Sequence, residues 1–266
     1  MTFVLLGILN AQAAAGGGGI DPSTLNPDLW LDASDASTIT ESGGSVSQWD
    51  NKGTLSNFVQ ATSANQPTTG ANTLNGLNVI DFASDHLNAT STNEYKFLHD
   101  GTVYFFAFVG KGTDSNDLNL VWGTESDSGS VIGQSFGIDD RSSAGRTGAV
   151  RYAISNGSSA VVNVIDNNQF PLNQFNLASG LADPGNATAA DRLEYYLDDG
   201  TVRKENSFTG TPSTSNPSET MSIGSSRASG NLSGSIAELI VVSGANATEE
   251  NRAGIVEYLN NKWSVF

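Results

Sequence analysis

The protein has 266 residues, no cysteine, and 28 acidic against 12 basic side chains, which gives a formal net charge of -16 at pH 7. The absence of cysteine excludes disulfides, thiolate zinc sites and cysteine nucleophiles. The acidic balance argues against nucleic-acid binding, because that function needs clustered basic residues to displace counterions from phosphates. Since His86 and His99 are the only histidines, little material remains for a histidine-based zinc site or a catalytic triad.

The chain opens with an apolar run, residues 3–9, that is followed by alanines and by four glycines at positions 16–19. The run is far too short to span a membrane. Ala11-Gln12-Ala13 is similar to a signal-peptidase site, but no Lys or Arg precedes the run as an export signal requires. A cleaved signal peptide therefore remains an alternative. We favour the interpretation that residues 1–19 form a docking peptide, with the glycines as a flexible tether. The residues of this peptide that we expect to bind a partner are Phe3, Val4, Leu5, Leu6, Ile8 and Leu9.

Residues 20–266 are predicted to form one domain, because nothing like an interdomain linker interrupts them. Short apolar stretches alternate with clusters of Gly, Ser, Asn and Asp, a pattern typical of many short strands joined by turns. Residues 102–109 (TVYFFAFV) are predicted to form a strand buried on both faces, and residues 192–203 a hairpin that turns at Asp199-Gly200. Further strands are predicted at residues 78–82, 118–122, 135–138, 150–154, 161–165, 174–181, 220–223 and 234–242.

One helix is predicted near the end of the chain, in ATEENRAGIVEYLNNKW. Thr248 can cap its first turn, where acidic residues follow, and Lys262 lies in the last turn. Residues 255, 256, 259 and 263 share one apolar stripe, which predicts that the helix packs on the strands with Trp263 in the core.

Four segments together resemble the concanavalin A-like, laminin-G-like jelly roll: residues 30–35 (WLDASD), 46–51 (VSQWDN), 76–82 (GLNVIDF) and 234–242 (GSIAELIVV) before the helix. The resemblance implies an all-β, two-sheet antiparallel jelly-roll sandwich with one C-terminal helix and an extended N-terminal peptide. The fold needs the first and last strands to pair. Trp30 and Trp49 are large aromatics in strand-like contexts, which predicts that they seal the core near that pairing. The opening residues LLGILNAQAA resemble the start of accessory virion proteins of tailed phages.

The fold alone does not determine function, because such sandwiches include lectins, glycan hydrolases and structural modules. Hydrolases of this superfamily carry alternating Glu and Asp along one strand, a pattern that is absent here. Glu238 stands alone in an otherwise apolar strand, where a solvent-facing edge position explains it at least as well as catalysis. We therefore predict that the protein is not an enzyme.

Two kinds of ligand site remain as candidates. A glycan site needs an exposed aromatic beside polar groups, and residues 111–143 with Trp122 are the candidate region. Calcium prefers short oxygen ligands in loops, which makes Asp32 and Asp35 candidate ligands. The acidic clusters at residues 114–117, 125–127 and 139–140 have the same composition, although Asp and Asn also favour turns by themselves.

The favoured hypothesis is a structural or decoration protein on the exterior of a tailed-phage virion. It would bind other capsid or tail proteins through its N-terminus, form a homo-oligomer for which we expect a trimer, and display a sandwich that binds glycans or a host surface. The alternatives are a secreted bacterial carbohydrate-binding module with a cleaved signal peptide, and a polysaccharide hydrolase.

Overall fold

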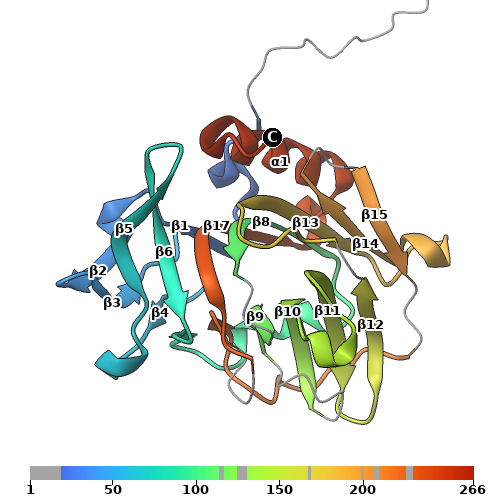
Figure 1. The fold of residues 1–266 in the computed structure, drawn as a ribbon. Coiled ribbons are helices and arrows are strands. Elements are labelled where there is room, and N and C mark those ends of the chain that lie inside the picture. The colour runs from blue at the N-terminus through green and yellow to red at the C-terminus, as the bar shows by residue number, and fades with distance from the viewer. Residues whose placement is uncertain are drawn as a thin grey trace, which may run out of the picture.

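The computed structural model describes residues 19–113, 117–124, 131–166, 169–198, 201–206, 210–225 and 230–266. Within these ranges the chain is mostly β, with a single α-helix, α1 (Glu249–Trp263), close to its end (Figure 1). The strands are β1 (Leu29–Asp32), β2 (Ile39–Ser42), β3 (Ser45–Trp49), β4 (Phe58–Val59), β5 (Thr68–Leu74), β6 (Leu77–Ala83), β7 (Leu87–Ala89), β8 (Tyr104–Gly112), β9 (Leu118–Gly123), β10 (Ile132–Asp139), β11 (Ala149–Asn156), β12 (Ala160–Asp166), β13 (Asn176–Ala182), β14 (Leu193–Leu197), β15 (Thr201–Asn206), β16 (Ser222–Ile223) and β17 (Ser233–Ser243).

The described strands pair antiparallel into one continuous sheet that curls on itself. One half runs β15, β14, β13, β8 and β17, and β17 also pairs with β1 and β6. The other half runs β12, β11, β10, β9, β16, β7, β4 and β3. Figure 1 shows β8, β13 and β14 above β9 to β12, and at one side β2, β3, β5 and β6 connect the halves.

Alternation along β8 explains how this sheet buries two cores. Phe106 and Phe108 point into the core between the two halves, whereas Phe105, Ala107 and Val109 point to the outer face. Successive side chains of a strand face opposite sides, so both faces of β8 are apolar and both need cover. The prediction of a strand buried on both faces is confirmed.

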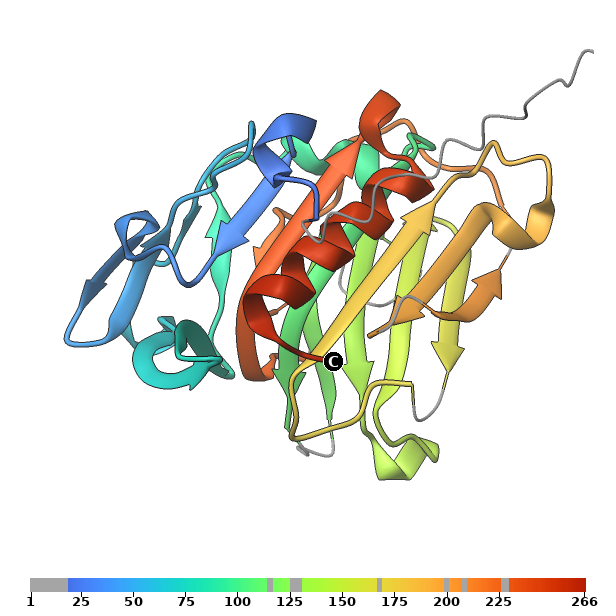
Figure 2. The ribbon, with the colours of Figure 1, turned by 90° about the horizontal axis from the view of Figure 1, so that it is seen from above.

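Helix α1 covers the outer face of β8, β13 and β17, as Figure 2 shows from above. Its N-cap is Thr248, whose hydroxyl accepts a hydrogen bond from the backbone N–H of Asn251 at 3.2 Å. The predicted stripe of Ile255, Val256, Leu259 and Trp263 is buried against the sheet. None of the helices in the described ranges has both the length and the apolar character that crossing a membrane requires.

The all-β architecture with one C-terminal helix is confirmed, and so is the pairing of the first and last strands, β1 with β17. Each predicted strand overlaps an observed one, and β14 and β15 pair as the predicted hairpin, although its turn at residues 199–200 lies outside the described residues. Trp30 and Trp49 are buried as expected. A two-sheet jelly-roll topology stays a prediction, since the pairings link the described strands into one sheet.

Candidate functional site

A buried cluster of polar and charged side chains surrounds Glu238 of β17, whose side chain has no exposed surface. Its Oε1 accepts hydrogen bonds from the indole N–H of Trp30 at 2.7 Å and from the hydroxyl of Tyr258 at 3.2 Å. Its Oε2 accepts from the indole N–H of Trp263 and from the Nζ of Lys262, both at 2.7 Å. The prediction of a solvent-facing edge position is wrong, because β17 lies between β1 and β8 and its outer face is covered by α1.

Two lysines connect this carboxylate to the predicted calcium ligands. Lys262 also donates to Asp32 at 2.7 Å, and Lys52 lies 3.1 Å from Asp32 and 2.9 Å from Asp35. Ammonium groups therefore stand between the carboxylates where the calcium hypothesis places a cation. Among the described residues, no three acidic or histidine side chains converge so that they could hold a metal ion.

The carboxylates of Glu238 and Asp32 in this cluster are buried and their pKa values are shifted. Burial raises the pKa of Glu238 and the charge of Asp32 raises it further, while Lys262 and the Trp263 indole only partly offset this. Burial also acts to raise the pKa of Asp32, but hydrogen bonds from Lys262 and Ser34 outweigh it, so that this pKa lies below its usual value. Perturbed carboxylates in a cleft suggest a functional site, but Glu238 is fully buried and Asp32 is only 4% exposed. The cluster ties β1, β17 and α1 together.

Trp122, the candidate glycan platform, lies in the core between the two halves of the sheet and has no exposed surface. Its ring packs against Phe106 and Phe136 with centroid distances of 5.4 and 5.9 Å. The expectation of an exposed ring at this position is wrong, because Trp122 points to the inner face of β9. The indole N–H has no hydrogen-bond partner among the residues that the structure describes.

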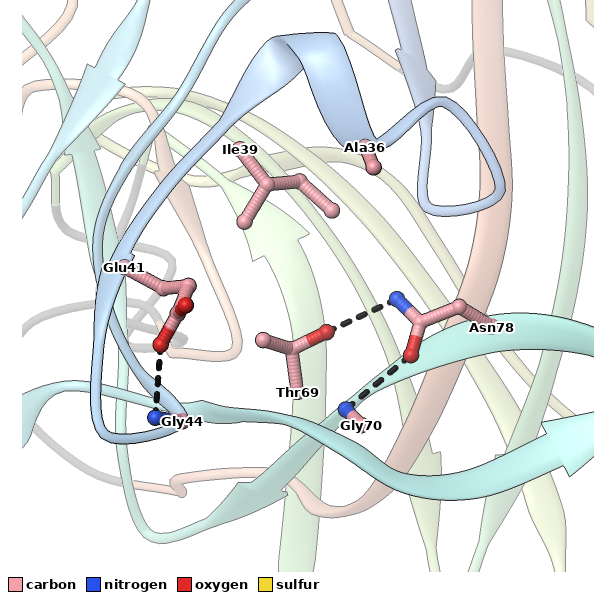
Figure 3. Close-up of a pocket in the computed structure, with 7 residues that line it drawn as sticks. All are labelled: Ala36, Ile39, Glu41, Gly44, Thr69, Gly70 and Asn78. Atoms are coloured by element: carbon pink, nitrogen blue, oxygen red, sulfur yellow. Dashed lines mark hydrogen bonds between the residues drawn. The ribbon is translucent and has the colours of Figure 1, made fainter.

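An open pocket of about 460 Å³ lies instead at the side of the molecule where β2, β3, β5 and β6 meet. We call it the Glu41 pocket; its lining residues are Ala36, Ile39, Glu41, Gly44, Thr69, Gly70 and Asn78. Figure 3 shows Glu41 and Asn78 on opposite sides of it, with Ile39 and Ala36 forming an apolar wall between them. The pairing of Ser45 with Thr68 brings the β2–β3 hairpin next to the β5–β6 hairpin and so assembles the pocket.

Hydrogen bonds fix the polar side chains of the Glu41 pocket in place. Asn78 accepts from the N–H of Gly70 at 3.0 Å and donates to the hydroxyl of Thr69 at 2.7 Å. Glu41 accepts from the N–H of Gly44 at 2.6 Å through Oε2. This leaves Oε1 of Glu41 as an acceptor and the O–H of Thr69 as a donor for a ligand.

The two glycines of this pocket have backbone conformations that other residues rarely adopt. Gly44 has a φ of +86° and Gly70 a φ of +82°, in the left-handed region that glycine occupies without strain. In both, the backbone N–H turns toward a side-chain oxygen of the pocket. The Gly43-Gly44 turn after Glu41 was a sequence signal for a tight turn, but the sequence did not show that residues 69–78 lie opposite.

The predicted partner-binding residues Phe3, Val4, Leu5, Leu6, Ile8 and Leu9 lie outside the described residues, as do residues 16–18 of the predicted tether. The described chain begins beside α1, where the N–H of Ile20 donates to the carbonyl of Gly254 at 3.1 Å. The docking-peptide hypothesis stays a prediction.

No protein-family model and no curated protein matches the sequence. Solved structures do match the fold. The chain resembles a GH54 α-L-arabinofuranosidase with a TM-score of 0.53 and 13% identity, over 90% of this chain and 60% of that one. It resembles domain 4 of AbnA, a GH43 extracellular arabinanase from Geobacillus stearothermophilus solved with arabinotriose, with a TM-score of 0.50 and 8% identity over 87% and 98% of the two chains.

A third match is the binding domain of botulinum neurotoxin serotype D, with a TM-score of 0.50 and 13% identity over 88% of this chain. The chain spans about half the length of that domain, 51%. At such identities the likeness is one of fold, and the matched structures are β-sandwich domains. The ligands of the matched proteins are properties of those proteins and are not transferred to this chain.

Proposed function

We propose that this chain is a non-catalytic glycan-binding module that holds neutral sugar units in the Glu41 pocket. The observation that carries the proposal is the pairing, in one open pocket, of an apolar wall with hydrogen-bonding groups already fixed by the protein. A sugar ring presents both an apolar C–H face and a rim of hydroxyls, so it can use both features.

The free groups of the pocket suit a ligand rich in hydroxyl donors. Oε1 of Glu41 has no hydrogen-bond partner within the described part of the chain, and the amide oxygen of Asn78 keeps one lone pair after accepting from Gly70. Thr69 supplies a hydroxyl donor. Among the residues that the structure describes, no Lys or Arg lines the pocket, which favours neutral over acidic sugars. The volume of about 460 Å³ lies within the range of small-molecule sites.

The carboxylate content argues for binding over hydrolysis. Glycoside hydrolysis uses a pair of carboxyl groups that flank the scissile bond, whereas within the described ranges Glu41 is the one carboxylate that lines this pocket. We therefore expect no release of reducing sugar from polysaccharides on prolonged incubation. Steady release that is lost in Glu41→Gln would contradict this part of the proposal.

The experiment is a screen of the full chain against a panel of immobilised neutral glycans, followed by calorimetric titration of the best ligand. Glu41→Gln should weaken binding roughly 10- to 100-fold, because hydrogen bonds to a charged group contribute about 1.5–3 kcal/mol. Ile39→Ser should also weaken it by removing the apolar wall. Glu257→Gln is the matched control, since Glu257 is an exposed glutamate of α1 away from this pocket. Absence of binding to every glycan, or equal binding by the Glu41 and Glu257 variants, would refute the proposal.

A further inference from the structure

The outer face of β6, β17 and β8 changes from apolar to polar where the cover of α1 ends. Val79, Ala237 and Val109 belong to the core under the helix. The next outward positions along these strands are Asp81, Ser235 and Lys111, and they line a second open pocket of about 300 Å³. This pocket, which we call the Lys111 pocket, lies on the opposite face of β6 from Asn78 and the Glu41 pocket.

Strand register places the three polar side chains in one row. Ser235 pairs with Asp81 on one side and with Lys111 on the other. Neighbouring strands are about 4.8 Å apart, so the row presents an acid, a hydroxyl and a base at regular spacing. Beyond Lys111 the row ends at Phe175, whose ring centroid is 5.1 Å from the Lys111 Nζ.

The two charged groups of the row are held in different ways. Asp81 accepts from the hydroxyl of Ser235 at 2.6 Å and from the amide of Asn72 at 2.8 Å, one bond to each carboxylate oxygen. Each oxygen keeps a lone pair that can accept from a ligand hydroxyl. Lys111 forms no ion pair within the ranges that the structure describes, and the Phe175 ring holds its ammonium by a cation–π contact. Its N–H groups therefore remain available to an acceptor.

We propose that the Lys111 pocket binds a carboxylated sugar unit of the hexuronic acid type. The sugar carboxylate pairs with the ammonium of Lys111, and the hydroxyls on the far side of the ring donate to Asp81. A neutral sugar satisfies only the second of these groups, so the pocket discriminates by charge. The inference goes beyond the neutral-glycan proposal and does not depend on it, because the two pockets lie on opposite faces of the sheet.

The test is a calorimetric titration of the full chain with short oligomers of galacturonic, glucuronic and mannuronic acid, each beside the same oligomer reduced to the neutral sugar. At least one acidic oligomer should bind, and its reduced form should bind at least tenfold more weakly. Lys111→Gln should lower the affinity for the acidic oligomer at least tenfold, and added salt should weaken binding of the unmodified chain. Lys96→Gln, a half-buried lysine that likewise forms no ion pair among the described residues, should change nothing.

Three results would overturn the inference: no acidic oligomer binds, the reduced oligomer binds equally, or the Lys111 and Lys96 variants behave alike. Glu41→Gln separates the two proposals, since it should leave acidic-oligomer binding intact while weakening neutral glycans. Thermal melting of each variant checks that it is folded. Loss of neutral-glycan binding alone therefore bears on the Glu41 pocket, and loss of acidic-oligomer binding alone bears on the Lys111 pocket.

Discussion

Removing the ammonium of Lys262 should strongly destabilise the protein at neutral pH. This group lies 2.7 Å from both Asp32 and Glu238, whose side chains are 6% and 0% exposed. Lys262→Met leaves two buried carboxylates facing each other with one cation fewer between them. Breaking a buried ion pair in this way costs about 3–5 kcal/mol, and at roughly 2–4 °C per kcal/mol for a chain of this size the melting temperature falls by about 10 °C.

The pH dependence of this loss has a defined sign. Burial and Asp32 already raise the pKa of Glu238, and Lys262 acts against that rise, so the variant raises this pKa further. A carboxyl whose folded-state pKa lies above its unfolded value takes up a proton in the folded state first, and stability increases as the pH falls through that value. The difference in unfolding free energy between the unmodified chain and Lys262→Met should therefore shrink as the pH is lowered from 7 toward the usual pKa range of a glutamate.

Calorimetric unfolding across this pH range, with Lys96→Met as the control, measures both effects. The control should stay within about 0.5 kcal/mol of the unmodified chain, as is usual for side chains without specific partners. Adding Glu238→Gln to Lys262→Met should restore part of the stability at pH 7, because it removes an uncompensated buried charge. The reasoning is refuted if Lys262→Met unfolds like the control at pH 7, or if its deficit grows on acidification.

Other predictions follow from single contacts. Carbon-13 NMR should find the Asp35 carboxyl with a pKa of about 2, because Ser37 and Lys52 donate hydrogen bonds to it. Lys52→Gln should move this pKa toward 3.8. A normal pKa in the unmodified chain would count against the pairing of Asp35 with Lys52. Because lysines occupy the space between these carboxylates, millimolar calcium should leave the melting temperature unchanged, and a clear rise would revive the calcium hypothesis. Thr248→Ala should cost about 1 kcal/mol in urea unfolding through loss of the helix N-cap, and an unchanged midpoint would show that the cap contributes nothing. Trp122→Ala should cost about 3–5 kcal/mol as a core truncation while the folded variant keeps its glycan affinity; selective loss of binding would mean that the ring contacts ligand.

The local sequence pattern was sufficient to predict the strands and the helix whose formation depends on neighbouring residues. Strands rich in aromatic and β-branched residues, such as β8, and the helix begun by Thr248 are found where the sequence predicts them. The strands β1 to β5 and β7 have weaker patterns and depend on pairing with distant segments. Sheet curvature and register, which bring those segments together, are properties of the whole chain.

The candidate sites required tertiary information for the same reason. Trp122 was taken as exposed because its surroundings are rich in loops, but its ring packs in the core against Phe106 and Phe136. Glu238 was taken as an edge residue because nothing in the sequence shows that α1 folds back over β17 or that Lys262 reaches it. The Glu41 pocket combines the β2–β3 and β5–β6 hairpins, which the pairing of Ser45 with Thr68 makes neighbours.

The most direct test of the glycan-binding account is an NMR titration of the isotope-labelled chain with the best neutral oligosaccharide from the screen. The account predicts saturable shifts of the backbone amides of Gly44, Thr69 and Gly70, because these line the Glu41 pocket, and loss of those shifts in Glu41→Gln. Amides of the Lys111 pocket, such as that of Thr113, should stay in place with a neutral ligand. Saturable shifts confined to another surface, or the same shifts in Glu41→Gln, would contradict the account.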